Sequence, residues 1–241
     1  MVENPCYNPL VDNVAQRAIE IHKRLLKEYG TPSWRVPLPP LDELISTILS
    51  QNTNDLNRDR SFNSLKDRFP TWESVRDAPS QEVIEAIRSA GLANQKGPRI
   101  QALLQAITQE RGNLDLEFLR DCQPGEVKAW LLQFKGVGPK TAAIVMQFSL
   151  GMPAFPVDTH IYRLSGRLAL RDPKANAEVT HDILADLFPQ ETYYAVHLNL
   201  IRHGREICHA RKPACERCIL QDLCQYYQNL DKKAGERDSI E

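Results

Sequence analysis

Four cysteines lie within seventeen residues near the end of the chain, and their spacing is typical of metal ligands. Cys208, Cys215, Cys218 and Cys224 follow the pattern C-x6-C-x2-C-x5-C. Such a short looping segment can bring four thiolates around one centre, either a tetrahedral zinc ion or a four-iron cluster. Zinc modules usually use two close pairs, and the second pair here is stretched to five intervening residues, which favours iron–sulphur. Two disulfides are the remaining alternative, and a reducing compartment argues against them.

A second candidate site is the segment 131–143, which reads as a helix, a tight turn and a helix. Gly136 and Gly138 permit turn dihedrals that other residues resist, and Pro139 suits the first helical position. The turn, with Val137 between its glycines, would present backbone N–H groups and a helix N-terminus to a phosphate. This contact would ignore base sequence. The alternative is an ordinary helix–helix turn.

Lys140, in the first turn of the second of these helices, is a candidate nucleophile. A cation is unfavourably placed near the positive end of a helix dipole, which favours the neutral amine. A neutral amine can attack carbon and form a Schiff base. Asp158 follows eighteen residues later, in the run Val-Asp-Thr-His, at a predicted helix start where it can serve as an N-cap. The alternative is that Lys140 is a solvated surface residue and Asp158 only a cap.

The elements that must position these residues are helices, because helical periodicity dominates the chain and no strand alternation stands out. The first predicted helix contains Val14 and ends at Gly30, and the second opens at Leu41. The third and fourth helices are predicted to begin at the N-caps Asp55 and Ser80. The buried face of the third helix is predicted to consist of Leu56, Phe62, Leu65 and Phe69. Further helices are predicted over 98–111, 125–134, 139–150, 159–170, 177–187 and 192–209. The fold class is therefore all-α.

Composition and charge are those of an ordinary soluble protein of one or two domains. The chain has 241 residues and a net charge of −1, so its overall charge does not indicate nucleic-acid binding. A local cluster of five basic residues against two acidic ones is a candidate phosphate-binding surface; its basic members are Arg202, Arg205, Arg211, Lys212 and Arg217. No apolar run is long enough to span a bilayer, and the N-terminus has no signal core, so an intracellular location is expected.

The hairpin with its lysine, the Val-Asp-Thr-His run and the four-cysteine loop occur in an order that resembles the endonuclease III family of helix-hairpin-helix DNA glycosylases. The resemblance runs from about Leu41 to Tyr226 and includes Gly91-Leu-Ala-Asn-Gln-Lys96 and the segment 203–215. It implies a helix-hairpin-helix glycosylase fold, with two helical domains flanking a DNA-binding cleft. One domain would span 36–151, the other would combine 1–35 with 152–230, and 231–241 would be a disordered tail.

The resemblance also implies a function in base excision repair. The enzyme would remove oxidised or ring-saturated pyrimidines from duplex DNA and cleave the abasic site by β-elimination. Lys140 would be the nucleophile and Asp158 its carboxylate partner, meeting at the cleft, while the four cysteines would hold a [4Fe-4S] cluster. Its partner would be duplex DNA with damaged bases or abasic sites. A monomer in the prokaryotic cytoplasm, associated with the nucleoid through DNA, is expected.

Further DNA-binding residues follow from the same resemblance. Leu92 matches an apolar wedge that fills the gap left by the extruded base, and the turn 136–138 would contact the backbone. Counting back from Asp55 places Asn52 where the family usually has a polar glutamine wedge, with Gln51 just before it, so either residue could take this role. The segment 50–55 and the pair Phe134-Lys135 differ from the commonest bacterial pattern, so lesion range and opposite-base preference are not predicted.

Two alternatives to this function are considered. The first is an enzyme of the same fold directed at mismatches or abasic sites. The second is a non-catalytic DNA-binding protein in which the hairpin and cysteine loop only hold phosphates. The pairing of Lys140 with Asp158 argues against the second alternative, because phosphate binding needs no carboxylate.

Overall fold

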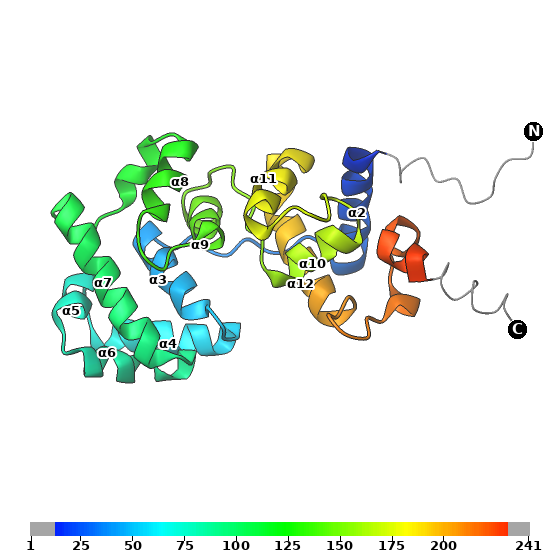
Figure 1. Ribbon diagram of the computed structural model, residues 1–241. Helices are drawn as coiled ribbons and strands as arrows, with labels where there is room; N and C mark the ends of the chain where they lie inside the picture. Colours follow the sequence, from blue (N-terminus) through cyan, green and yellow to red (C-terminus); the bar gives the residue numbers. More distant parts are fainter. Residues whose placement is uncertain (1–12, 231–241) are drawn as a thin grey trace, which may run out of the picture. The chain divides into compact units, whose positions relative to one another are not determined.

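The computed structural model describes residues 13–230, and these form helices with no β-strand (Figure 1), which confirms the all-α prediction. The helices belong to two compact units. One is Val36–Pro153, and the other combines Met1–Arg35 with Ala154–Glu241. The tail predicted over 231–241 lies outside the described residues. Within the described part of the chain, no helix has the length and apolar character needed to cross a membrane.

The continuous unit, Val36–Pro153, is built around one almost wholly buried helix, α3 (Pro40–Ser50). Nine of its eleven residues are buried, and α4, α7, α9 and η3 pack against it. The other elements of this unit are α4 (Asp55–Arg68), α5 (Trp72–Asp77), α6 (Ser80–Ala86), η1 (Arg88–Ala90), α7 (Ala93–Arg111), η2 (Glu117–Asp121), α8 (Pro124–Leu132), α9 (Pro139–Ile144) and the π-helical η3 (Val145–Ser149).

The discontinuous unit brings an N-terminal helix together with the C-terminal third of the chain. Helix α2 (Val14–Tyr29) packs against α11 (Ala177–Leu187) and α12 (Tyr193–Glu206), and α10 (Thr159–Arg167) packs against α12. The short 3-10 helix η4 (Gln190–Thr192) lies between α11 and α12, and two more, η5 (Cys215–Arg217) and η6 (Gln221–Leu223), come after α12. The core of this unit includes Ile21, Leu25 and Phe155 and extends to Cys224 beside the cysteine loop.

Several predicted helix starts are wrong by a residue or more. Asn54 is the N-cap of α4, since its side chain accepts a hydrogen bond from Asn57 N, and Asp55 is the first helical residue. Ser80 likewise lies inside α6, which begins after Pro79. Leu56 is 68% exposed and does not belong to the predicted inner face.

Two further differences concern α5 and α7. Helix α5 was not predicted, although the reciprocal bonds between Thr71 and Ser74 form a capping box at its start. Helix α7 begins at Ala93, so Pro98 lies inside the helix and not at its first position. The start of α7 depends on the left-handed backbone conformation of Leu92, which the residue types of this segment do not predict.

Candidate active site and metal centre

The hairpin between α8 and α9 has the expected conformation. Gly136 has a φ of 93°, which favours glycine, and Gly138 is the N-cap of α9, followed by Pro139 at its first position. The side chain of Val137 is buried, and its N–H bonds to the carbonyl of Phe134, so Val137 closes the turn. The first turn of α9 still carries N–H groups that have no intrahelical partner, as any helix start does.

Lys140 is exposed in that first turn, directly after the hairpin. Its neighbour Thr141 is buried, which fixes the direction of the helix against the unit. The Lys140 amine therefore stands next to the part of the unit best suited to receive a phosphate backbone.

Asp158 caps α10, as its position in the sequence predicts. Its Oδ1 accepts a hydrogen bond from Ile161 N at 2.8 Å, and the residue is half-buried. The helix thus fixes one carboxylate oxygen. No other bond to this side chain is found among residues 13–230, so Oδ2 can still accept a hydrogen bond or a proton. Lys140 and Asp158 belong to different units, and each lies at the start of a helix, Lys140 in the first turn of α9 and Asp158 at the N-cap of α10.

The two candidate polar wedge residues differ sharply in surroundings. Gln51 is half-buried: its Oε1 accepts from Arg99 at 3.1 Å and its Nε2 faces the Gly136 carbonyl at 3.5 Å. Asn52 is exposed and has a positive φ of 54°. A positive φ at a non-glycine residue is strained, and such strain often marks a functional position.

Leu92 shares this combination of exposure and strain. It is 48% exposed with a φ of 51°, and it follows Gly91, whose φ is 67°. A large apolar side chain on a left-handed backbone costs about 1–3 kcal/mol, and exposure in water returns little of that cost. About half of the Leu92 surface is therefore free to contact a ligand, and the other half can pack at the start of α7.

Lys96 joins these two loops, a role that the sequence did not suggest. Its side chain is 2% exposed, and its Nζ donates to the carbonyl of Leu49 at 2.7 Å and to that of Ala90 at 2.9 Å. These carbonyls precede Gln51–Asn52 and Gly91–Leu92 respectively. Burial lowers the pKa of Lys96, with a smaller contribution from Arg99. One buried amine therefore fixes the starting points of both candidate wedges.

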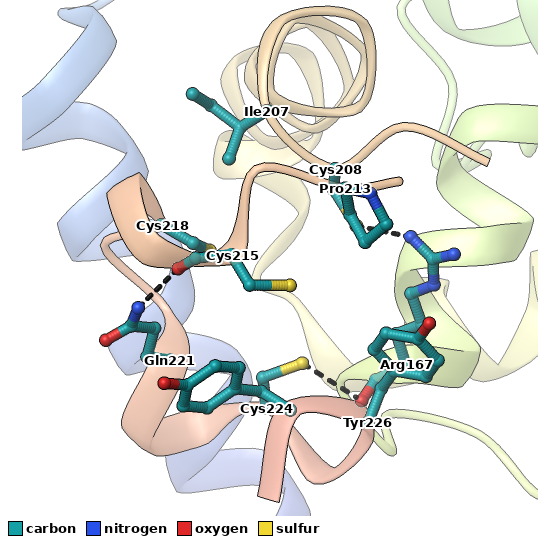
Figure 2. Close-up of a pocket in the computed structure, with 10 residues that line it drawn as sticks. Arg167, Ile207, Cys208, Pro213, Cys215, Cys218, Gln221, Cys224 and Tyr226 are labelled. Carbon is teal, nitrogen blue, oxygen red and sulfur yellow. Dashed lines mark hydrogen bonds between the residues drawn. The ribbon is translucent and has the colours of Figure 1, made fainter. Parts of the chain in front are cut away.

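The four cysteines surround a single pocket (Figure 2). Figure 2 shows the sulphurs of Cys215 and Cys224 pointing toward its middle. Residues that line it include all four cysteines with Arg167, Ile207, Pro213, Gln221, Tyr226 and Tyr227. The C-x2-C pair spans η5, and Cys224 follows η6, so two consecutive 3-10 turns present three of the four thiols.

The donor set fits a four-iron cluster, because four thiols from one short segment line the same pocket. In a four-iron cluster each thiolate binds a different iron, so the four sulphurs enclose a larger volume than around zinc. Burial raises the pKa of the Cys218 thiol to about 11 and also raises those of Cys215 and Cys224. The raised pKa values favour the protonated thiols at these three positions, and metal binding must displace their protons.

Side chains from α2 and α10 hold the cysteine loop. Arg24 on α2 pairs with both carboxylate oxygens of Asp222 at 2.5 and 3.0 Å. On α10, Arg163 donates to the Cys208 carbonyl at 2.8 Å, and Arg167 donates to the Cys208 sulphur at 3.1 Å. The helix that Asp158 caps therefore also contacts the metal centre of its own unit.

All five basic residues of the predicted phosphate-binding cluster are exposed. Arg202 pairs with Glu206 at 2.9 Å and lies over the ring of Tyr29. Lys212 has a positive φ of 49° in the loop between the first two cysteines. The cluster thus lies on α12 and the cysteine loop, on the surface of one unit.

Comparisons with known proteins agree with this site. The family model described as HhH-GPD superfamily base excision DNA repair protein matches residues 45–190, and the model described as iron-sulfur binding domain of endonuclease III matches 208–224. Endonuclease III of Sulfolobus acidocaldarius is 33% identical over 186 residues, covering 76% of this chain and 81% of that protein. A protein of Arabidopsis thaliana, assigned by name to the DNA glycosylases, is 40% identical over 172 residues; the match covers 71% of this chain and spans only 59% of the plant protein.

Solved structures are similar as well. A trapped covalent intermediate of an endonuclease III with DNA superposes with a TM-score of 0.75 at 28% identity, covering 89% of this chain and 97% of that one. The helical fold of this chain is therefore shared with a DNA-bound relative.

Proposed function

The chain belongs to the endonuclease III family of the HhH-GPD superfamily, and on this premise we propose that Lys140 is its nucleophile and Asp158 the carboxylate partner. The protein is a DNA glycosylase of base excision repair with abasic-site lyase activity, it binds DNA, and it carries a [4Fe-4S] cluster. The observation that carries the residue assignment is the exposed amine of Lys140 in the first turn after the hairpin.

The reaction begins when the target nucleotide is extruded from the duplex, at a cost of a few kcal/mol of lost stacking and pairing. The neutral amine of Lys140 attacks C1′ of the deoxyribose, and the damaged base leaves with the electron pair of the glycosidic bond. The attached nitrogen then loses a proton while the C1′–O4′ bond of the sugar ring breaks and O4′ takes up a proton, which gives the Schiff base. The Schiff base acidifies the C2′ proton, whose removal expels the 3′ phosphate by β-elimination. The trapped covalent DNA complex of the solved relative supports a covalent step of this kind.

Asp158 assists through the oxygen that the helix does not use. Its Oδ1 is engaged by Ile161 N, so the carboxylate cannot rotate freely. The other oxygen can accept the proton that Lys140 must lose and can stabilise positive charge on the sugar as the base departs.

The gap left by the extruded base is filled by Leu92 and Asn52 in this proposal. Both are exposed, and both have the positive φ that their loops require. Gln51 acts instead as support, because its amide is engaged by Arg99 and Gly136. The hairpin amides at Gly138 and the start of α9 hold the backbone phosphate.

Cys208, Cys215, Cys218 and Cys224 are proposed as the four cluster ligands, on the support of the shared pocket and the matched domain. The bound cluster ties four points of the loop together and can in addition accept or donate an electron. Base removal and β-elimination are redox-neutral, so the residues that carry out these steps need no electron from it.

We propose oxidised or ring-saturated pyrimidines as the substrates. A duplex with thymine glycol, a mismatched duplex and an abasic duplex, each treated with borohydride, distinguish this proposal from mismatch or abasic preference. Lys140→Gln should bind thymine-glycol DNA but give no trapped adduct and no strand cut. Lys135→Gln, an exposed lysine of the same hairpin, is the matched control and should trap normally. Normal trapping by Lys140→Gln would show that another amine is the nucleophile.

A monomeric state and a prokaryotic, cytoplasmic location stay predictions from the sequence. The relatives include an archaeal and a plant protein, so they do not favour one kind of organism. Light scattering with and without DNA would measure the mass of the enzyme.

A further inference from the structure

His203, on the last turn of α12, contacts the cysteine loop at two points. Its carbonyl oxygen accepts the backbone N–H of Cys208 at 2.8 Å. Its ring Nε2 lies 3.4 Å from the sulphur of Cys218, within hydrogen-bond reach for sulphur. One residue thus contacts both the first and the third cysteine, although it lies outside the matched iron–sulphur segment 208–224.

The second nitrogen of this ring contacts a helix from the other end of the chain. Nδ1 of His203 lies 2.9 Å from the hydroxyl of Tyr29, the last residue of α2. The two rings meet edge to face with centroids 6.0 Å apart, and Arg202 covers the tyrosine ring. Both ring nitrogens of His203 are therefore engaged, one by a sulphur and one by a hydroxyl.

The presence of the cluster determines which nitrogen carries the hydrogen. A cluster-bound Cys218 is a thiolate and can only accept, so Nε2 must be the donor. The ring is 2% exposed, so water has little access to either nitrogen. A neutral ring with hydrogen on Nε2 has a bare Nδ1, which must accept from Tyr29. Burial raises the pKa of Tyr29 to about 12, so this hydroxyl keeps its proton and can donate.

We propose that Tyr29 and His203 form a hydrogen-bond relay from α2 to the Cys218 thiolate, and that this relay raises the reduction potential of the cluster. Tyr29 is a positioning residue that fixes the tautomer of His203, and His203 donates to the cluster ligand. A donor to a ligand sulphur stabilises the more negative, reduced state, because the extra electron density is shared with the sulphurs. The relay depends on the cluster and its ligands, and it holds whether or not Lys140 is the nucleophile.

The test is a redox titration of the purified holoprotein, followed by absorbance and EPR under anaerobic conditions. Tyr29→Phe removes one hydroxyl and leaves the ring beneath Arg202. At a fixed potential, the ratio of reduced to oxidised cluster in this variant should be roughly three- to tenfold lower than in wild type. A change of this size corresponds to the free energy of one weakened hydrogen bond. Tyr193→Phe is the matched control: it removes a buried hydroxyl of the same unit that donates to the Ala185 carbonyl, and its ratio should equal that of wild type.

A second variant and a second readout keep the test decisive. His203→Leu should lower the ratio at least as much as Tyr29→Phe, with four irons per chain in both. If His203→Leu loses iron, the comparison of Tyr29→Phe with Tyr193→Phe and wild type decides the test. The Fe–S stretching bands in resonance Raman spectra should shift on transfer to D₂O in wild type and shift less in Tyr29→Phe. Equal potentials and equal deuterium shifts for Tyr29→Phe, Tyr193→Phe and wild type would overturn the relay.

Discussion

Arg99 donates from its guanidinium to Oε1 of Gln51 at 3.1 Å, and this bond joins α7 to the loop after α3. A methyl group at Gly136 would lie 2.5 Å from Cδ of Arg99, so glycine at that position gives the arginine room as well as permitting its positive φ. The hairpin and the loop after α3 are thus braced by one arginine. Gln51 belongs to this brace, which supports our proposal that the exposed Asn52 and not Gln51 faces DNA.

The first prediction separates Asn52 from Gln51. Asn52→Ala should lower excision of a base-paired lesion about tenfold while leaving cleavage of an abasic site nearly unchanged, because an abasic site needs less help with extrusion. Gln51→Ala should instead lower the free energy of unfolding by about 1 kcal/mol and reduce both reactions together. Single-turnover rates on the two duplexes and urea unfolding measure these effects. The reverse pattern would assign the wedge to Gln51.

The second prediction concerns Asp158. Asparagine caps helices as well as aspartate does, so Asp158→Asn should change stability by less than about 1 kcal/mol. Excision should fall on the order of 10²-fold or more, since proton transfer and charge stabilisation are withdrawn. Asp172→Asn removes an exposed carboxylate that bonds to Lys174 N in the same unit, and it should retain full activity. A fully active Asp158→Asn enzyme would reduce this aspartate to a helix cap.

The third prediction tests the clamp made by Lys96. Lys96→Met keeps most of the buried volume but leaves the carbonyls of Leu49 and Ala90 without their donor. Unfolding free energy should fall by about 2–3 kcal/mol, and excision of base-paired lesions should suffer more than cleavage of abasic sites. Lys135→Met, at an exposed position, should change stability by less than about 0.5 kcal/mol. A stability loss no larger than in this control would show that the amine contributes nothing to the loops.

The fourth prediction concerns the exposed basic cluster. The double variant Arg205→Glu/Lys212→Glu should weaken binding to damaged and undamaged duplexes alike. The slope of log affinity against log salt should become shallower by about 2, the value for two lost phosphate contacts. Lys23→Glu/Lys27→Glu makes the same charge change on exposed positions of α2 in the same unit. If both double variants shift the slope equally, net charge and not this surface controls binding.

The cysteine loop and the hairpin could be predicted from the sequence because both depend on local spacing, and the base-excision chemistry was predicted from the family that these motifs resemble. Cys208, Cys215, Cys218 and Cys224 lie close enough along the chain that backbone turns alone can gather them. Gly136 and Gly138 likewise specify a turn that few other residues can form. The helix boundaries at Asp55 and Ser80 were each misplaced by one residue: Asn54 caps α4 as well as an aspartate would, and α6 begins after Pro79 without a side-chain cap.

Only the tertiary structure decided what supports these local motifs. Lys96 shows this clearly: in sequence it is one more lysine on a helix, and only the packing of α7 against α3 buries its amine against two carbonyls. Tyr29 and His203 lie 174 residues apart and meet because α2 packs on α12. Long-range side-chain bonds of this kind leave no periodicity or spacing in the sequence, since the residues that form them are brought together by the burial of other, apolar faces.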